Sequence, residues 1–343
     1  MTAGASGGLL FQLRSPFLGY STVIASKSHS QQVSPIWLWL HLFSLEAPLV
    51  AVIWAWALAH FHHLPIMPGV LPGLGLSVWI VYVLDRVIDG LGSCHEGLDV
   101  RHAFHRRWRW LLMLLVVGAS AWAVWLALWI VPSGLLGQCA SLGVLMLLYL
   151  ILFPAAGGGR FRWVVMPVTC MGTMLLAHTL PFSPGFQLLM SALSLGVLVL
   201  MIFRRLHLRL VTALSKDVVG GLLFALGCTA WTRFSLEGGE ALSGTIELLL
   251  LSVLFISNLM SLSSRESHSR WLGLGFGTVG GVLLLVLTGR VSGSLGVLAG
   301  ATACGLILLG LLSRRREMMS VDAYRVLADL AVLVPVLGLL IWA

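Results

Sequence analysis

The chain has 343 residues, of which 58% are hydrophobic and only 10% are charged. A water-soluble protein of this length needs more charged side chains to cover its surface, so the composition excludes an ordinary soluble domain. The apolar residues come in blocks of about 20, which is the length of helix that crosses a hydrocarbon core of ~30 Å. We therefore predict an all-α, polytopic transmembrane helical bundle.

The first 34 residues are polar, rich in Ser and Gly, and lack the basic start and apolar core of a signal peptide. We expect residues 1–34 to form a cytoplasmic arm and residues 35–343 to form the transmembrane domain. The apolar runs predict a bundle of about nine to eleven helices. The eleven candidate spans lie near residues 35–61, 68–91, 109–131, 135–154, 162–181, 186–204, 217–233, 242–264, 271–289, 293–312 and 322–342.

Basic residues lie almost entirely in alternate loops between these spans. On one side are Arg101, Arg106, Arg107, Arg109, Arg160, Arg162, Arg204, Arg205, Arg209, Lys216, Arg265, Arg270 and Arg314 to Arg316, whereas the other side has only Arg233 and Arg290. Cytoplasmic loops of membrane proteins carry an excess of Lys and Arg, so this pattern places the N-terminus and the basic loops in the cytoplasm. The net charge of +8 thus follows from the basic loops on one side of the membrane. We expect membrane lipids as partners of this chain, and no nucleic acid.

Two carboxylates end the span near 68–91. Asp85 and Asp89 are four residues apart and share one face of a helix, where they repel each other. A helix C-terminus also disfavours negative charge. Mg²⁺ would offset both penalties, because it takes one or two carboxylates together with the phosphates of a substrate. The alternative is a pair of interfacial salt bridges to arginines of the following loop.

The segment after this loop is basic. His102, His105, Arg106 and Arg109 recur at helical spacing on one face and form a basic stripe suited to holding phosphate oxygens. The alternative is an anchor at the lipid head groups, with solvated histidines. Elsewhere, Glu46 lies in an apolar span, and intramembrane acids usually face a cavity or a partner. We expect Glu46 to line a cavity.

The stretch YVLDRVIDG resembles the first aspartate-rich motif of the UbiA superfamily of intramembrane prenyltransferases, NDxxDxxxD. Asp85 and Asp89 match its last two aspartates, while Val81 and Tyr82 stand at the Asn and first Asp positions. The family has nine helices, with motif loops after the second and the sixth. The loop after the sixth span here keeps only Lys216-Asp217 of the second motif. RHAFHRR, KDVVGGLLFALG and YRVLADLAVLVP also resemble a divergent bacterial branch of this superfamily.

The resemblance implies a UbiA-like helical bundle around a lipid-open cavity in a bacterial inner membrane. An isoprenyl diphosphate and a lipid-soluble acceptor, either a lipid or an aromatic compound, would be the substrates. Asp85, Asp89 and Asp217 would be the catalytic and Mg²⁺-binding residues. The implied or candidate substrate-binding residues are Arg86, Arg101, His105, Arg106, Lys216 and Glu46.

Two other functions remain open from the sequence. The chain could keep the fold and bind a lipid or an assembly partner without catalysis, because Val81 and Tyr82 replace two motif residues. It could also be an unrelated transporter that uses Glu46 and the aspartates in ion coupling. Transporters usually show repeat symmetry and helices interrupted at the membrane midplane, and neither is evident in this sequence.

Overall fold

The computed structural model describes residues 42–92, 104–105, 107–152, 171, 188, 191–192, 194–195, 215–236, 241–261 and 265–342. All of these belong to the unit Ile36–Ala343. The predicted arm over residues 1–34 lies outside the described residues, as do most of the two spans predicted near 162–181 and 186–204.

Every regular element in the described ranges is a helix, as the hydropathy predicts. The helices are α2 (Glu46–Phe61), α3 (Val70–Gly92), α5 (Arg109–Trp129), α6 (Ser133–Leu152), α10 (Lys216–Cys228), α11 (Ala230–Ser235), α12 (Ala241–Met260), α13 (Arg265–Leu287), α14 (Gly293–Arg314), η1 (Arg316–Met318) and α15 (Val321–Trp342). Six of those described, α3, α5, α12, α13, α14 and α15, are long and apolar enough to cross a membrane. The chain is therefore a polytopic, all-α membrane protein.

Two boundaries differ from the sequence prediction. The span predicted over 217–233 is two helices, α10 and α11, which meet at Thr229. The hydroxyl of Thr232 donates a hydrogen bond to Glu247, and the guanidinium of Arg233 donates one to the carbonyl oxygen of Leu226. These contacts hold α11 as a separate short helix. Helix α2 begins at Glu46 because the chain turns at Ser44, whose φ of 54° lies in the left-handed region.

Helix α12 lies at the centre of the described bundle. It packs against α10, α13, α14 and α15, while α2 packs against α15, α3 and α10. Leu250 and Leu254 of α12 are fully buried, together with Trp54 of α2. The indole nitrogen of Trp54 donates a hydrogen bond to the carbonyl oxygen of Val332 at 3.2 Å, which satisfies its polar atom inside the apolar core.

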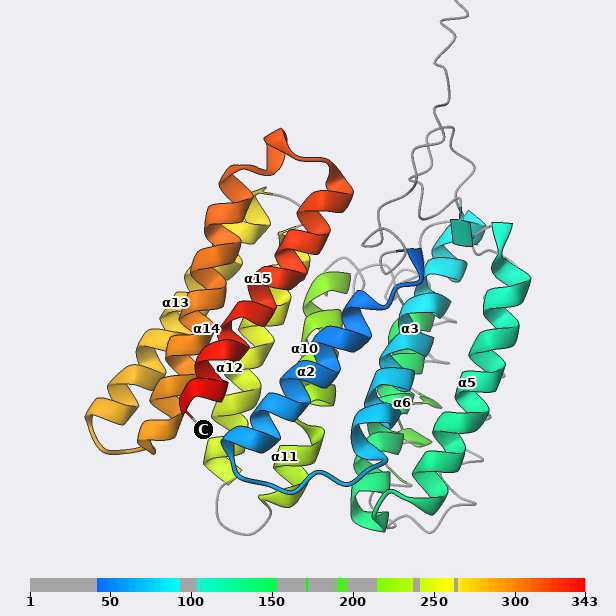
Figure 1. Cartoon of the computed structure of the whole chain (residues 1–343), viewed down its shortest axis with the longest axis horizontal. Coiled ribbons are helices and arrows are strands. Elements are labelled where there is room, and N and C mark those ends of the chain that lie inside the picture. Colours follow the sequence, from blue (N-terminus) through cyan, green and yellow to red (C-terminus); the bar gives the residue numbers. More distant parts are fainter. Residues whose placement is uncertain are drawn as a thin grey trace, which may run out of the picture. The chain divides into compact units, whose positions relative to one another are not determined.

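The ends of the helices alternate along the chain. The N-terminal ends of α2, α5, α10 and α15 lie at one end of the bundle, together with the C-terminal ends of α3 and α14 (Figure 1). That end carries the basic residues Arg107, Arg109, Lys216, Arg314 and Arg315 of the described chain. The side-to-side charge asymmetry read from the sequence therefore corresponds to one physical end of the bundle.

Helix α5 carries tryptophans at both of its ends. Trp110 is 76% exposed and Trp129 is 77% exposed, and Arg109 lies over the ring of Trp110 at 5.3 Å. Tryptophan is enriched where helices pass through the two membrane–water interfaces. Its position at both ends of a 21-residue span fits a helix that faces lipid along its length.

The backbones of α10 and α12 meet at a glycine. A Cβ added to Gly221 would lie 2.8 Å from the backbone nitrogen and 2.9 Å from the Cα of Ile256. A side-chain rotation cannot relieve this overlap, because the atoms that would be struck belong to the backbone. Only glycine allows the two helices to pack this closely.

We expect Gly221→Ala to lower the stability of the protein by about 1–3 kcal/mol, because overpacking a well-packed contact has costs of this size. Gly280→Ala in α13 is the matched control, since a Cβ at that exposed position would meet nothing within 4 Å. Alanine there should be neutral or stabilising by up to ~1 kcal/mol, as in other helix interiors. Thermal unfolding in detergent measures both, and equal melting temperatures for the two variants would contradict the close packing.

Candidate functional site

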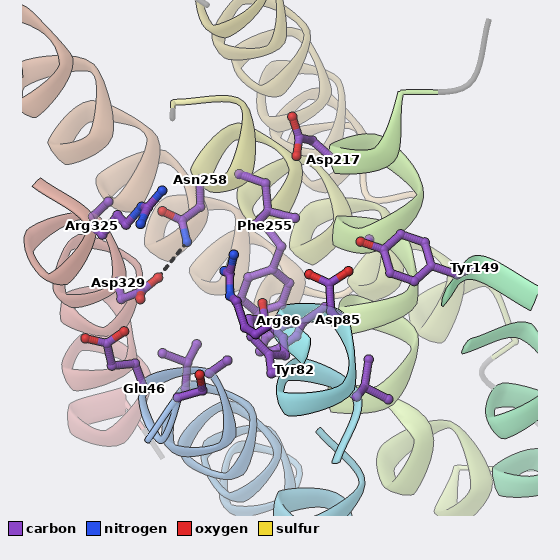
Figure 2. Close-up of a pocket in the computed structure, with 18 of the residues that line it drawn as sticks. Glu46, Tyr82, Asp85, Arg86, Tyr149, Asp217, Phe255, Asn258, Arg325 and Asp329 are labelled. Carbon is purple, nitrogen blue, oxygen red and sulfur yellow. Dashed lines mark hydrogen bonds between the residues drawn. The ribbon is translucent and has the colours of Figure 1, made fainter. Parts of the chain in front are cut away.

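A cavity of about 280 Å³ opens among α2, α3, α6, α10, α12 and α15, at the end of the bundle that carries the basic residues (Figure 2). Ionisable side chains line the walls of this cavity, and apolar side chains line its base. The described lining residues are Ser44, Glu46, Ala47, Val50, Val81, Tyr82, Asp85, Arg86, Met146, Tyr149, Asp217, Gly220, Phe224, Phe255, Asn258, Leu259, Arg325, Ala328 and Asp329. Five of the residues singled out in the sequence, Glu46, Asp85, Arg86, Lys216 and Asp217, thus lie in or beside one cavity.

An ion pair joins two segments that are far apart in the sequence. The ammonium nitrogen of Lys216, the first residue of α10, lies 2.8 Å from Oδ1 of Asp85 on α3. The side chains are 32% and 19% exposed, so both can be reached from the cavity mouth. The sequence alternative paired Asp85 with arginines of the next loop, but in the structure its described partner is the lysine that begins α10.

The next residue brings a second carboxylate to the same wall. Asp217 follows Lys216 in the first turn of α10, where an acidic side chain is favoured by the helix dipole. Tyr149 of α6 reaches the same wall, and its hydroxyl would lie 3.4 Å from a Cβ at Gly220. Figure 2 shows Asp85 and Tyr149 near each other on this side of the cavity, with Asp217 farther along the same side. We call Asp85, Lys216, Asp217 and Tyr149 the α3–α10 side.

The opposite wall is built by α2, α12 and α15. Glu46 opens α2, and the side-chain nitrogen of Asn258 donates a hydrogen bond to Oδ1 of Asp329 at 2.9 Å. Arg325 lies one turn before Asp329 on α15 and also lines the cavity. We call Glu46, Asn258, Arg325 and Asp329 the α2–α15 side. The cavity-lining position predicted for Glu46 is confirmed, although Glu46 starts the helix instead of lying within the span.

Arg86 is drawn between these two sides in Figure 2. Its Nε, the hydroxyl oxygen of Ser44 and the amide oxygen of Asn258 are all buried, and none has a hydrogen-bond partner among the described residues. A buried polar atom left unpaired costs about 1–3 kcal/mol. Three such atoms in the lining of one cavity are best explained by a ligand or water that completes their hydrogen bonds.

The base of the cavity is apolar. The rings of Phe224 and Phe255 meet edge to face, with their centroids 4.7 Å apart, and both side chains are almost fully buried. Val50 completes this base from α2. A ligand that fills the cavity would therefore meet charge at one end and hydrocarbon at the other, which is the pattern of an amphipathic molecule.

The residues on the α3–α10 side fit a divalent cation that is bound together with a ligand. No group of three or more His, Cys, Asp and Glu side chains able to hold a metal occurs within the described ranges. Mg²⁺ needs fewer protein ligands, because it commonly takes one or two carboxylates and completes its shell with water and substrate phosphates. Asp85 and Asp217 can supply those carboxylates.

Several predicted site residues are not placed by the structure. Arg101 and Arg106 lie outside the described residues, and Asp89 is part of α3 but its side chain is not described.

His105 is only 1% exposed and is not among the described residues that line the cavity. The sequence interpretation of a solvated interfacial histidine is therefore wrong. Phe104 packs edge to face on Phe43, with ring centroids 5.4 Å apart, and this contact buries the start of the segment.

A second polar cluster, which the sequence analysis missed, lies at the other end of α2 and α12. Glu247 is fully buried in α12, where its two carboxylate oxygens accept a hydrogen bond from the hydroxyl of Thr232 and contact Nε2 of His62, each at 3.1 Å. His62, in the turn after α2, is therefore part of this polar network. A single Glu within the apolar run of α12 was the available signal, because an acid inside a span rarely lacks a partner.

Comparisons of this chain with family models, with curated proteins and with solved structures return no match.

We expect Glu247→Ala to destabilise the protein by about 3–5 kcal/mol, because it removes the carboxylate between His62 and Thr232 and leaves their buried polar atoms unpaired. Glu317→Ala is the control, since that side chain is exposed in η1. Chemical or thermal unfolding in detergent measures the difference. If the two variants melt together, the buried cluster does not stabilise the junction of α2, α11 and α12.

Proposed function

We propose that this chain is a Mg²⁺-dependent membrane prenyltransferase of the UbiA type. It would transfer an isoprenyl group from an isoprenyl diphosphate to a lipid-soluble acceptor. The observation that carries the proposal is the Asp85–Lys216 ion pair, with Asp217 in the lining of the same cavity, above an apolar base and inside a bundle of membrane-spanning helices. These residues come from the two segments of the sequence that resemble the family's motifs.

The charge of the cavity supports a metal requirement. Four carboxylates line it against two arginines, and Lys216 is already paired with one of those carboxylates. A diphosphate alone would be repelled by this excess of negative charge. Mg²⁺, when bound, would neutralise the charge that develops on the departing diphosphate. Asp85 and Asp217 would hold it, with Asp89 as a further carboxylate from the same helix as Asp85.

A basic residue would hold the diphosphate itself. Lys216 has a flexible stem and a point charge, so it can leave Asp85 and contact a phosphate oxygen once a cation compensates the carboxylate. Arg86, the other candidate from the sequence, lies between the two sides of the cavity and would balance a carboxylate of the α2–α15 side. The isoprenyl chain would lie over Phe224 and Phe255. The bundle would sit in a bacterial inner membrane, with its basic end and N-terminus in the cytoplasm.

One observation favours a second candidate, a protein that binds a prenyl lipid without transferring it. Asp85 and Asp217 are the two carboxylates described on the α3–α10 side, and one of them is already paired with Lys216. Such a protein would bind the diphosphate with Mg²⁺ but would release no free diphosphate. A release assay on the wild type with an allylic prenyl diphosphate distinguishes the two functions.

We expect Asp85→Ala, Asp89→Ala and Asp217→Ala each to lower the Mg²⁺-dependent affinity for geranylgeranyl diphosphate at least tenfold, because each removes a carboxylate from the metal. Mg²⁺ alone should bind the wild type weakly, since part of its shell would come from phosphate. Isothermal titration calorimetry in detergent measures both affinities. Asp322→Ala is the control, because Asp322 opens α15 and is not a described lining residue. Full diphosphate release in the aspartate variants would rule out the metal site.

We expect Lys216→Met to weaken geranylgeranyl diphosphate binding about tenfold, because it removes a cation from the phosphate oxygens while keeping much of the side-chain volume. Binding of the diphosphate at saturating Mg²⁺ is the measurement. If Lys216 only neutralises Asp85, the opposite result will appear, with tighter Mg²⁺ binding and unchanged affinity for the diphosphate.

A further inference from the structure

The cavity has two chemically different sides, and the metal–diphosphate proposal uses only one of them. The α3–α10 side has two carboxylates and one lysine, so it carries net negative charge. The α2–α15 side has Glu46 and Asp329, whose charges are matched by Arg325 on the same side and by Arg86 between the sides. A site without net charge favours a neutral ligand over a carboxylate or an ammonium group.

The unpaired hydrogen-bonding groups on the α2–α15 side and next to it indicate the kind of neutral ligand. The amide oxygen of Asn258 accepts no hydrogen bond from a described residue, and Nε of Arg86 and the hydroxyl of Ser44 are likewise buried without a partner within the described part of the chain. The amide oxygen of Asn258 needs a hydrogen-bond donor, and the N–H of Arg86 Nε needs an acceptor. A hydroxyl group can accept from Arg86 and donate its one proton to Asn258 on binding, and that proton can pass to the neighbouring Asp329 carboxylate on reaction.

The Asn258–Asp329 hydrogen bond fixes the carboxylate that such a hydroxyl would meet. Asn258 donates from α12 to Oδ1 of Asp329 on α15 at 2.9 Å. A carboxylate held by a neighbouring helix keeps its orientation when the ligand arrives, which is what a proton acceptor requires. Both side chains line the same cavity as Asp85 and Asp217.

We propose that the α2–α15 side is the acceptor subsite, that it takes a neutral, hydroxyl-bearing lipid-soluble molecule, and that Asp329 accepts the hydroxyl proton. This inference rests on the proposed prenyl transfer. The acceptor oxygen forms a bond to C1 of the allylic chain while the bond from C1 to the diphosphate oxygen breaks. The electron pair of that bond leaves with the diphosphate, and the hydroxyl proton passes to Asp329. The product is a prenyl ether. Asn258 is a positioning residue for Asp329.

The test uses three probes with the same tail and different heads, namely 1-hexadecanol, hexadecanoic acid and hexadecylamine. Binding of each radiolabelled probe to the full chain in detergent is measured with and without geranylgeranyl diphosphate and Mg²⁺. We expect 1-hexadecanol to bind at least tenfold more tightly than either charged probe. Tighter binding of the acid or the amine would overturn the assignment of a neutral, hydroxyl-bearing acceptor.

Variants then separate the two sides of the cavity. Asp329→Asn should lower formation of geranylgeranyl hexadecyl ether at least tenfold, measured by mass spectrometry, while Mg²⁺-dependent binding of geranylgeranyl diphosphate stays within about twofold of the wild type. Asp322→Asn, the same change on the same helix but away from the described cavity lining, should leave both readouts unchanged. Equal loss of diphosphate binding in Asp329→Asn and Asp85→Asn would show that the two sides are one site and overturn the inference.

Two further measurements keep the outcomes distinct. Asn258→Ala tests the same subsite should Asp329→Asn fail to fold, and it should weaken 1-hexadecanol binding without changing diphosphate binding. If the wild type binds no prenyl diphosphate, the proposed function fails. The subsite then stands only if 1-hexadecanol binding still depends on Asn258 and Asp329. If 1-hexadecanol binding is unaffected by either variant, the subsite is refuted whatever the outcome with the diphosphate.

Discussion

An ionised side chain among membrane-spanning helices must find a partner, because neither water nor the hydrocarbon core can compensate it cheaply. In the described bundle this constraint produces two polar sites at opposite ends of α2 and α12. Lys216 neutralises Asp85 at one end, and His62 and Thr232 contact Glu247 at the other. The packing around Leu250 and Leu254 of α12 is apolar and separates these two sites.

The two polar sites differ in whether they surround a cavity. Both carboxylate oxygens of Glu247 have a described partner and its side chain is fully buried, although Nε of the neighbouring Arg233 has none among the described residues. The cavity instead retains buried polar atoms without described partners, at Arg86 and Asn258, and it has room for a ligand. A satisfied network stabilises a fold, whereas an unsatisfied one beside a cavity is typical of a binding site.

Hydropathy and charge were sufficient to predict the fold class, because long apolar runs and alternating basic loops follow directly from the physics of the bilayer. The sequence also singled out Asp85, which lines the cavity. The partner of Asp85 could not be read from the sequence, since α10 begins 131 positions later and only packing brings Lys216 to α3. For the same reason, the Asn258–Asp329 bond and the burial of His105 are consequences of tertiary contacts.

The contact of Gly221 with Ile256 has a mechanical consequence for the cavity. Asp217 lies one turn before Gly221 on α10, and Asn258 lies just after Ile256 on α12. Because the backbones of α10 and α12 touch there, the close packing holds Asp217 and Asn258 on two helices that are tightly joined. Any widening that admits a bulky lipid must therefore come from movement of α2, α3, α6 or α15 against this pair.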